Sequence, residues 1–375
     1  MTGASQSGTN IPPGAAGSAE VLFERRGRLA VITLNRPRAV NALTAGMVGM
    51  LLEQLTAWAD DDGVATVLVR GAGERGLCAG GDIVAIYEDM LRGGNRTADF
   101  WQTEYRVNSL IARYPKPYVP LMDGLVLGGG VGISAHGSVR VVTERTRTGM
   151  PETTIGFAPD VGGTFLLARA PGEAGTHAAL TGAHLSGQDA LYLGLADHYV
   201  PSARLPGLVA ALEGESPETA VGRFNEEPPP SALAGHRDWI DACYAGAGAE
   251  DIVRRLRAWK GEGSADAALA AATIEEKSPT SVKVTLESLR RAKSLTLDEA
   301  LAQEYRAGLR FLSGPDFREG IRAQVVDKDR TPRWKPPTLG EVLPEDVARF
   351  FEPLEGRELD LRAAGGLQPK ETNHV

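Results

Sequence analysis

At 375 residues, with 42% hydrophobic and 23% charged residues, the chain is long enough for two domains or for one domain with a large appendage. Its formal net charge of -8 argues against a general nucleic-acid binder, which would present a basic face. No apolar run approaches the roughly 20 residues that cross a bilayer, so no membrane partner is predicted. Two distant cysteines, Cys78 and Cys243, suggest neither a disulfide framework nor a CxxC metal site, and this favours a cytoplasmic protein.

The N-terminal part begins with a polar tail and continues into short strands. Residues 1–19 lack a basic start and a long apolar stretch, so they predict a disordered tail rather than a secretory signal. Residues 21–37 predict two strands that meet at Gly27 and end at Pro37. Thr44 is a candidate cap for the next helix, whose apolar residues repeat at three and four positions.

Strand and helix patterns then alternate as far as residue 200. Strands are predicted from residues 64, 117 and 139. Helical patterns follow the loop at 78–82, cover 95–114 and follow the loop at 150–163. This alternation predicts an α/β fold with layered elements and interior strands, and we assign residues 20–213 to its core.

The remainder of the chain changes character. Residues 214–250, which contain NEEPPPSALAG, predict a linker or an exposed segment. Residues 251–335 show helical patterns alone, with Ser278 or Thr280 as the cap of one helix. Residues 336–375 predict a C-terminal arm with one short helix.

Two segments resemble familiar functional motifs, but the residues around them do not fit the function of either motif. GAGERG at 71–76 fits GxGxxG, yet it leads into another loop rather than a helix, so a surface turn explains it better than a dinucleotide site. GISAHG resembles a nucleophile elbow around Ser134, but His136 occupies the position where GxSxG needs glycine. The six histidines show no ligand spacing, and no metal site is predicted.

A glycine cluster at 128–132 follows a buried apolar run and precedes a helical pattern. Glycines at the start of a helix leave backbone N–H groups bare, and these can stabilise a carbonyl oxygen that becomes an oxyanion. Gly129 would give one such donor. CAGGD at 78–82 is a natural source of the second, because Gly81 can approach without a side chain.

Two carboxylates stand in one glycine- and proline-rich loop. Glu152 lies in MPETTIG and Asp160 in APDVGG, each between apolar segments. If both face one cavity, burial and mutual repulsion raise at least one pKa, which prepares a carboxylate for acid–base or nucleophilic work. The alternative is that one acid caps a helix and the other faces water.

These segments together resemble a known family. GLCAGGDI, KPYVPLMDGLVLGGGVG and MPETTIGFAPDVGG are similar to the enoyl-CoA hydratase/isomerase, or crotonase, superfamily, and in particular to its 3-hydroxyisobutyryl-CoA hydrolase subgroup. The resemblance extends over residues of about 20–335, including SPTSVKVTLESL and DFREGIRAQVVDKDRTPRWKP. It implies a crotonase-type spiral of ββα-like turns with a helical C-terminal region, and an acyl-CoA substrate.

The resemblance also implies roles for residues. Gly81 and Gly129 match the oxyanion-hole amides, Glu152 the catalytic glutamate and Asp160 the second carboxylate, and Glu104 matches a further substrate-contacting acid. The implied reaction is hydrolysis of a short acyl-CoA thioester, 3-hydroxyisobutyryl-CoA above all, as in valine degradation. Coenzyme A would be part of the substrate rather than a cofactor, and a homo-oligomer is left open.

One position separates this chain from the hydratases. They carry a glutamate two residues after the third glycine of the cluster, where this sequence has Gly132, so we expect a poor hydratase. Glu152 would either attack the carbonyl or act as general base on water, and the sequence does not choose between these roles. Three alternatives stay open: a hydratase or isomerase, a non-catalytic acyl-CoA-binding protein, and a serine hydrolase that uses Ser134.

Overall fold

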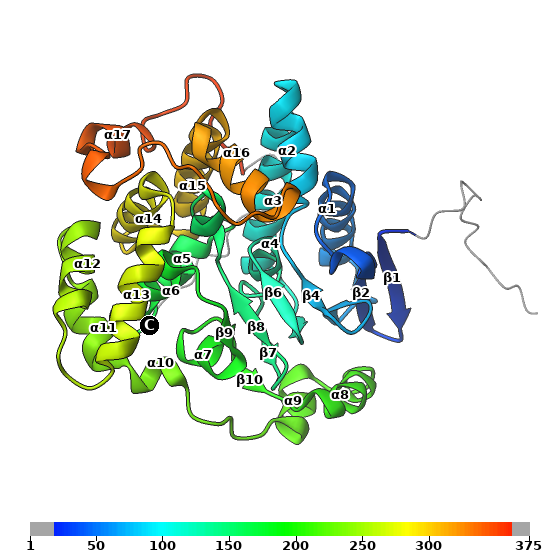
Figure 1. Ribbon diagram of the computed structural model, residues 1–375. Coiled ribbons are helices and arrows are strands. Elements are labelled where there is room, and N and C mark those ends of the chain that lie inside the picture. Colours follow the sequence, from blue (N-terminus) through cyan, green and yellow to red (C-terminus); the bar gives the residue numbers. More distant parts are fainter. Residues whose placement is uncertain (1–18, 362–375) are drawn as a thin grey trace, which may run out of the picture.

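The computed structural model describes residues 19–361, so the predicted tail at 1–19 and the end of the predicted arm lie almost entirely outside the described residues. Figure 1 shows the strands at the centre and one side of the molecule, with most C-terminal helices on the other side. Among residues 19–361, none of the helices combines the length and apolarity that a bilayer crossing requires.

A six-stranded sheet forms one layer of the core. Its first two strands are an antiparallel hairpin through Gly27, in which Val21 pairs with Leu34, and the later strands join in parallel. Every residue of β2 is buried, as expected for a strand covered on both faces. The order is β1 (Val21–Arg26), β2 (Leu29–Leu34), β3 (Thr66–Gly71), β5 (Tyr118–Met122), β7 (Val141–Val142) and β10 (His198–Tyr199).

A four-stranded sheet forms the second layer. It consists of β4 (Gly76–Cys78), β6 (Leu125–Leu127), β8 (Arg147–Gly149) and β9 (Leu185–Ser186), and only β9 is antiparallel to its neighbour. In each chain pair β3–β4, β5–β6 and β7–β8, the first strand joins the large sheet and the second joins the small one. A helix follows each pair, which confirms the predicted spiral of ββα-like turns.

Helices of the core close around these sheets. Thr44 caps α1 through a hydrogen bond from the Met47 amide, as predicted, and α1 packs on α3. The core helices are η1 (Pro37–Ala39), α1 (Ala45–Ala59), α2 (Ile83–Arg92), α3 (Arg96–Ala112), α4 (Gly129–Gly132), η2 (Glu152–Ile155), α5 (Gly163–Leu167), α6 (Ala174–Thr181), α7 (Gly187–Tyr192), η3 (Ser202–Arg204) and α8 (Leu205–Leu212).

The segment predicted as a linker, residues 214–250, is largely helical. It holds α9 (Pro217–Phe224), α10 (Ala232–Gly235) and α11 (Arg237–Tyr244), and its backbone is irregular at 214–216, 225–231 and 245–248. Trp239, Ile240, Cys243 and Tyr244 lie on one buried face of α11, and that apolar stripe explains why this stretch folds against the rest. The division of the chain into separate parts stays a prediction.

The C-terminal region is helical, as predicted, and it shares the core. Residues of α14 and α15 belong to the same hydrophobic cluster as residues of the sheets, and Figure 1 shows these helices beside α5 and α3. Ser278, rather than Thr280, caps α14. The elements are α12 (Ala249–Ala258), α13 (Ser264–Glu276), α14 (Pro279–Ala292), α15 (Leu297–Ser313), α16 (Pro315–Ile321), the π-helix η4 (Arg322–Val326), η5 (Leu339–Glu341) and α17 (Pro344–Arg349).

Candidate active site

The small sheet brings three predicted segments to one place. β4, β6 and β8 are parallel neighbours, so their carboxyl ends meet at one edge of the sheet. Gly81 follows the end of β4, Gly129 follows β6 and Glu152 follows β8, each within three residues. All three residues line one cavity of about 220 Å³. Edges formed by the carboxyl ends of parallel strands commonly hold ligands, because the loops there converge.

The two candidate oxyanion donors lie close together. A side-chain carbon built on Gly129 would lie 3.4 Å from the Gly81 amide nitrogen and 2.5 Å from Oε1 of Glu104, so only glycine fits this approach. Among the hydrogen bonds of the described residues, the amides of Gly81 and Gly129 donate to no backbone carbonyl. Two amides without an acceptor at one cavity are available to a ligand oxygen.

Glu152 begins η2 directly after Pro151, and it is buried. Its side chain is aimed at the glycine cluster, since Oε1 would lie 2.7 Å from a side-chain carbon on Gly128. Oε2 is buried and has no hydrogen-bond partner in the part of the chain that is described. Burial, and then the negative charge of Asp160, raise the pKa of Glu152 well above its ordinary value.

Asp160 lines the same cavity and has a dedicated donor. The Tyr105 hydroxyl donates to Oδ2 of Asp160 over 2.8 Å. Burial raises the pKa of Asp160 to about 7, and the Tyr105 hydrogen bond opposes that rise by stabilising the ionised form. Asp160 therefore has an environment different from that of Glu152 although both face one hollow.

Glu104 is the third acid of the cavity. Its side chain comes from α3, is 2% exposed and has an unpartnered Oε1 among the described residues. Burial, and then the charge of Asp160, raise the pKa of Glu104 well above its ordinary value. Because the three carboxyl groups line one cavity, the negative charge of one disfavours ionisation of its neighbours.

Aromatic side chains form the apolar wall of the cavity. The ring of Phe157 stacks on Trp101 and on Phe317, at centroid distances of 5.2 and 4.6 Å. Phe317 belongs to α16, so the C-terminal region supplies part of the wall. Such a wall excludes water and strengthens the electrostatic interactions inside.

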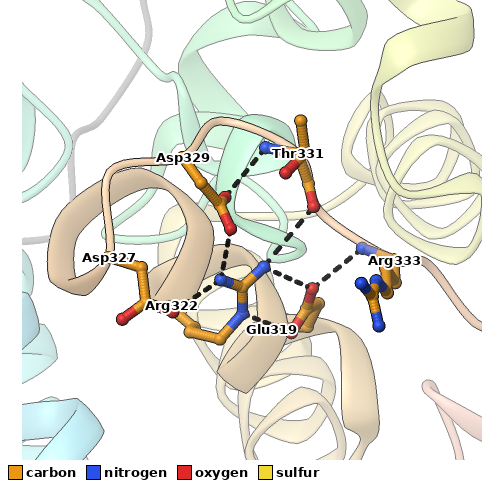
Figure 2. A network of polar contacts seen from close by, with 6 residues as sticks. All are labelled: Glu319, Arg322, Asp327, Asp329, Thr331 and Arg333. Atoms are coloured by element: carbon orange, nitrogen blue, oxygen red, sulfur yellow. Dashed lines mark hydrogen bonds and ion pairs between the residues drawn. The ribbon is translucent and has the colours of Figure 1, made fainter.

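The π-helix η4 also reaches the cavity, through Gln324. Its first residue, Arg322, binds the carboxylates of Glu319, Asp327 and Asp329 and thereby closes the turn that follows α16 (Figure 2). Thr331 and Arg333 add backbone contacts to the same group of residues. This network fixes the segment from which Gln324 extends.

The motifs set aside on sequence grounds have structural roles. Ser134 donates to the Gly130 carbonyl over 2.6 Å and His136 contacts the Val161 carbonyl at 2.8 Å, so the two do not form a nucleophile–base pair. Gly76, the last glycine of GAGERG, begins β4 and not a helix. Neither motif contributes to the cavity.

The sequence reasoning overlooked several cavity and support residues. Tyr105 stands beside Glu104, and the spacing of Trp101, Tyr105 and Asn108 along α3 marks one buried face that could have signalled it. Phe317 and Gln324 come from α16 and η4, more than 150 residues beyond Glu152 in the chain. No local pattern connects these residues with the glycine cluster.

The chain matches proteins of known class over nearly its whole length. A family model described as "Enoyl-CoA hydratase/isomerase" covers residues 29–351. The curated 3-hydroxyisobutyryl-CoA hydrolase, mitochondrial, of Mus musculus is 42% identical, over 91% of this chain and 91% of the relative. The protein of the same description from Gallus gallus is 40% identical, over 92% and 91%.

Two solved structures are also similar. One is described as a carnitinyl-CoA dehydratase from Mycobacterium thermoresistibile, with a TM-score of 0.88, 50% identity and coverage of 92% of this chain and 99% of that one. The other is described as an enoyl-CoA hydratase from Rhodobacter sphaeroides, with a TM-score of 0.85, 41% identity and coverage of 91% and 100%.

The chain therefore belongs to the enoyl-CoA hydratase/isomerase family, the class that its spiral core and glycine-lined cavity define. Within that family it groups with the 3-hydroxyisobutyryl-CoA hydrolases, as the resemblance in the sequence predicted.

Proposed function

We propose that this protein hydrolyses a short acyl-CoA thioester, with 3-hydroxyisobutyryl-CoA as substrate and 3-hydroxyisobutyrate and coenzyme A as products. One observation carries the proposal: within the described residues, the segments after β4, β6 and β8 bring Glu152 and two amides that donate to no backbone carbonyl to a single cavity. The curated relatives carry the name of this hydrolase over nine-tenths of the chain.

The reaction follows from the positions of these groups. The thioester oxygen accepts hydrogen bonds from the Gly81 and Gly129 amides, which stabilise the charge that develops as the carbonyl is attacked. Glu152 either attacks the carbonyl carbon itself or takes a proton from the attacking water. The carbon–sulfur bond then breaks, and coenzyme A leaves with the electron pair as a thiolate. If Glu152 is the nucleophile, this step leaves an anhydride between the acyl group and Glu152, and water then hydrolyses the anhydride to the free acid and Glu152. If Glu152 is the base, the attacking water supplies the oxygen of the acid directly.

Asp160 and Glu104 would complete the site. Asp160, oriented by the Tyr105 hydroxyl, positions the water or the hydroxyl of the acyl group and tunes Glu152 through its charge. Glu104, which lines the cavity beside Gly129, would contact the substrate. A base works best when its pKa lies near the operating pH, and burial moves these acids in that direction.

Hydration of an unsaturated acyl-CoA is the second candidate, because the solved relatives are described as a dehydratase and a hydratase. The position at which hydratases carry their extra glutamate speaks against it. A side-chain carbon on Gly132 would lie 2.6 Å from Cβ of Val161 and 2.8 Å from Nδ2 of Asn108. A second glutamate therefore has no room here.

Replacing Glu152 by glutamine tests the proposal. We expect Glu152→Gln to lower the release of thiol from 3-hydroxyisobutyryl-CoA by about 10²–10⁴-fold, because the base or nucleophile is lost. We expect the affinity for the acyl-CoA, measured by calorimetry, to change little. Glu144→Gln is the control, since Glu144 binds Ser202 outside the cavity. Hydrolysis by Glu152→Gln near the wild-type rate would remove Glu152 from the mechanism.

A parallel assay separates the rival functions. With crotonyl-CoA, a hydratase removes enoyl absorbance without releasing thiol, whereas a non-catalytic acyl-CoA-binding protein turns over neither compound.

The acyl-CoA is the partner we propose, without a separate cofactor or metal, and a homo-oligomer stays open. The expected cytoplasmic location has no support among the relatives, whose names place them in mitochondria.

A further inference from the structure

The loop that carries Asp160 has an uncommon backbone. Val161 adopts a φ of 51°, in the left-handed region that a β-branched residue rarely enters, and Gly162 follows with a φ of 80°. Such a conformation persists only where the surroundings determine it. The question is which part of the molecule holds this loop beside Glu152.

Glu304, in the C-terminal region, holds this loop through hydrogen bonds. This residue of α15 is 2% exposed, and its carboxylate accepts three hydrogen bonds from the Asp160 loop. The Gly162 amide donates to Oε2 over 2.7 Å, and the Thr164 amide and hydroxyl donate to Oε1 over 2.9 and 2.5 Å. Both oxygens of the carboxylate are therefore used, and all their partners lie within four residues of Asp160.

The next residue of α15 supports the other contact of Asp160. The ring of Tyr305 meets the ring of Tyr105 edge to face, at a centroid distance of 6.2 Å. Tyr105 in turn donates to Asp160. One turn of α15 thus contacts both the loop that carries Asp160 and the tyrosine that orients it.

We propose that Glu304 is a positioning residue for the hydrolytic reaction: it holds the 160–164 loop so that Asp160 faces Glu152 across the cavity. This inference rests on the proposed function. Glu304 does not line the cavity, so it acts through the loop and not on the substrate. The helical C-terminal region is then part of the construction of the site and not an appendage to it.

The donors around Glu304 favour its carboxylate form. Burial raises the pKa of Glu304 to about 8, and the hydrogen bonds from Thr164 and Gly162 oppose that rise because they stabilise the ionised group. All three partners are donors, and a carboxylate offers acceptor sites on both oxygens. Glutamine in the same place has one acceptor oxygen, and its amide group would face an N–H or O–H donor. Hydrogen bonds to a charged acceptor are also stronger than those to a neutral one. Glu304→Gln therefore changes the shape of the side chain very little, but it weakens the hydrogen bonds from Gly162 and Thr164.

The experiment compares Glu304→Gln with the wild-type chain. We expect kcat for thiol release to fall about 10–100-fold, since small misplacements of a catalytic group are costly, while KM changes less than about threefold. Hydrogen exchange at the amides of Gly162 and Thr164 accelerates at least about tenfold as their acceptor is lost. Glu304→Asp, which keeps the charge, recovers part of kcat.

Asp189→Asn is the matched control. Asp189 is a buried acid that accepts hydrogen bonds from Ser231 and Ser186, outside the cavity. It reports the effect of weakening a buried carboxylate network on stability alone, so we expect a lower melting temperature with kcat unchanged. If Glu304→Gln does not fold, Thr164→Val removes one of the three donors and is expected to lower kcat with KM retained.

The outcomes are separable. A wild-type chain that releases no thiol contradicts the proposed function, whereas faster exchange of the loop in Glu304→Gln still supports the positioning role. A wild-type chain that hydrolyses the thioester, with Glu304→Gln within twofold of its kcat, overturns the inference. The inference is also overturned if a smaller fraction of folded protein accounts for the whole loss of activity in Glu304→Gln.

Discussion

The three acids of the cavity differ in their partners rather than in their burial. Asp160 receives a hydrogen bond from Tyr105, while Glu152 and Glu104 each retain an oxygen without a partner among residues 19–361. Separate environments push the pKa values of neighbouring carboxyl groups apart, which divides the roles of acid and base among like residues. Burial raises the pKa of Asp160 to about 7, and burial and the charge of Asp160 raise the pKa values of Glu152 and Glu104 well above their ordinary range.

The pH dependence of the reaction follows from these raised pKa values. A raised pKa keeps an acid protonated to higher pH, so we expect kcat/KM to fall on the acidic side as Glu152 and Asp160, the latter with a pKa of about 7, take up protons. Tyr105→Phe removes a donor that favours ionised Asp160. The acidic limb then moves to higher pH by about one to two pH units, because a hydrogen bond to a charged group contributes about 1.5–3 kcal/mol.

Profiles of thiol release between about pH 5 and pH 9 measure this limb. Tyr114→Phe serves as the comparison, since its hydroxyl donates to the Leu55 carbonyl and not to an acid of the cavity. A limb that stays in place, or that moves to lower pH in Tyr105→Phe, contradicts the role given to the tyrosine.

At the scale of elements, the short helix α4 explains why the glycine cluster is so dense. Gly129 faces Glu104 of α3, and Gly132 faces Val161 of the Asp160 loop, so a side chain on either residue would displace a wall of the cavity. Because α4 carries no side chain at these two positions, β6, α3 and this loop can approach one another closely. Glycine costs conformational entropy inside a helix, and here the close approach requires it.

Gly132→Ala tests this packing. We expect a loss of about 1–3 kcal/mol in the free energy of unfolding, because the new methyl group meets Val161 and Asn108 in a filled core. Urea denaturation measures the change. Gly49→Ala in α1 is the control: nothing lies within 4 Å of its new carbon, so alanine there stabilises by up to about 1 kcal/mol. Equal effects of the two substitutions would argue against crowding at Gly132.

At the scale of the whole molecule, the sheets and the C-terminal helices share one core. Phe157, which follows η2, contacts the rings of three other residues beside the cavity: Trp101 of α3, and Phe311 and Phe317 of the C-terminal helices. A core that joins both parts makes their stabilities depend on each other. The active cavity lies at that junction, so it forms only when both parts are folded.

Unfolding of the full chain is therefore expected to be a single cooperative transition. Far-ultraviolet circular dichroism, which follows the helices, and tryptophan fluorescence, which follows residues such as Trp101 and Trp239, should give coincident curves in urea. Two separated transitions would show that residues 20–213 and 251–335 are independent domains, as the sequence alone allows.

The sequence by itself determined the α/β core, the helical C-terminal region, and the candidate residues Gly81, Gly129, Glu152 and Asp160. These features depend on local patterns: apolar periodicity marks elements, and glycines beside buried strands mark close approach. The helices within 214–250 were missed because a proline-rich stretch conceals the short apolar face of α11.

The tertiary structure alone decided which distant groups support those residues. Tyr105 is 55 positions from Asp160 in the chain, and Glu304 is 142 positions from Gly162. A hydrogen bond over such a separation leaves no periodic trace in the sequence, because the two partners occupy different elements and only the packing of α3 and α15 against the Asp160 loop brings them together.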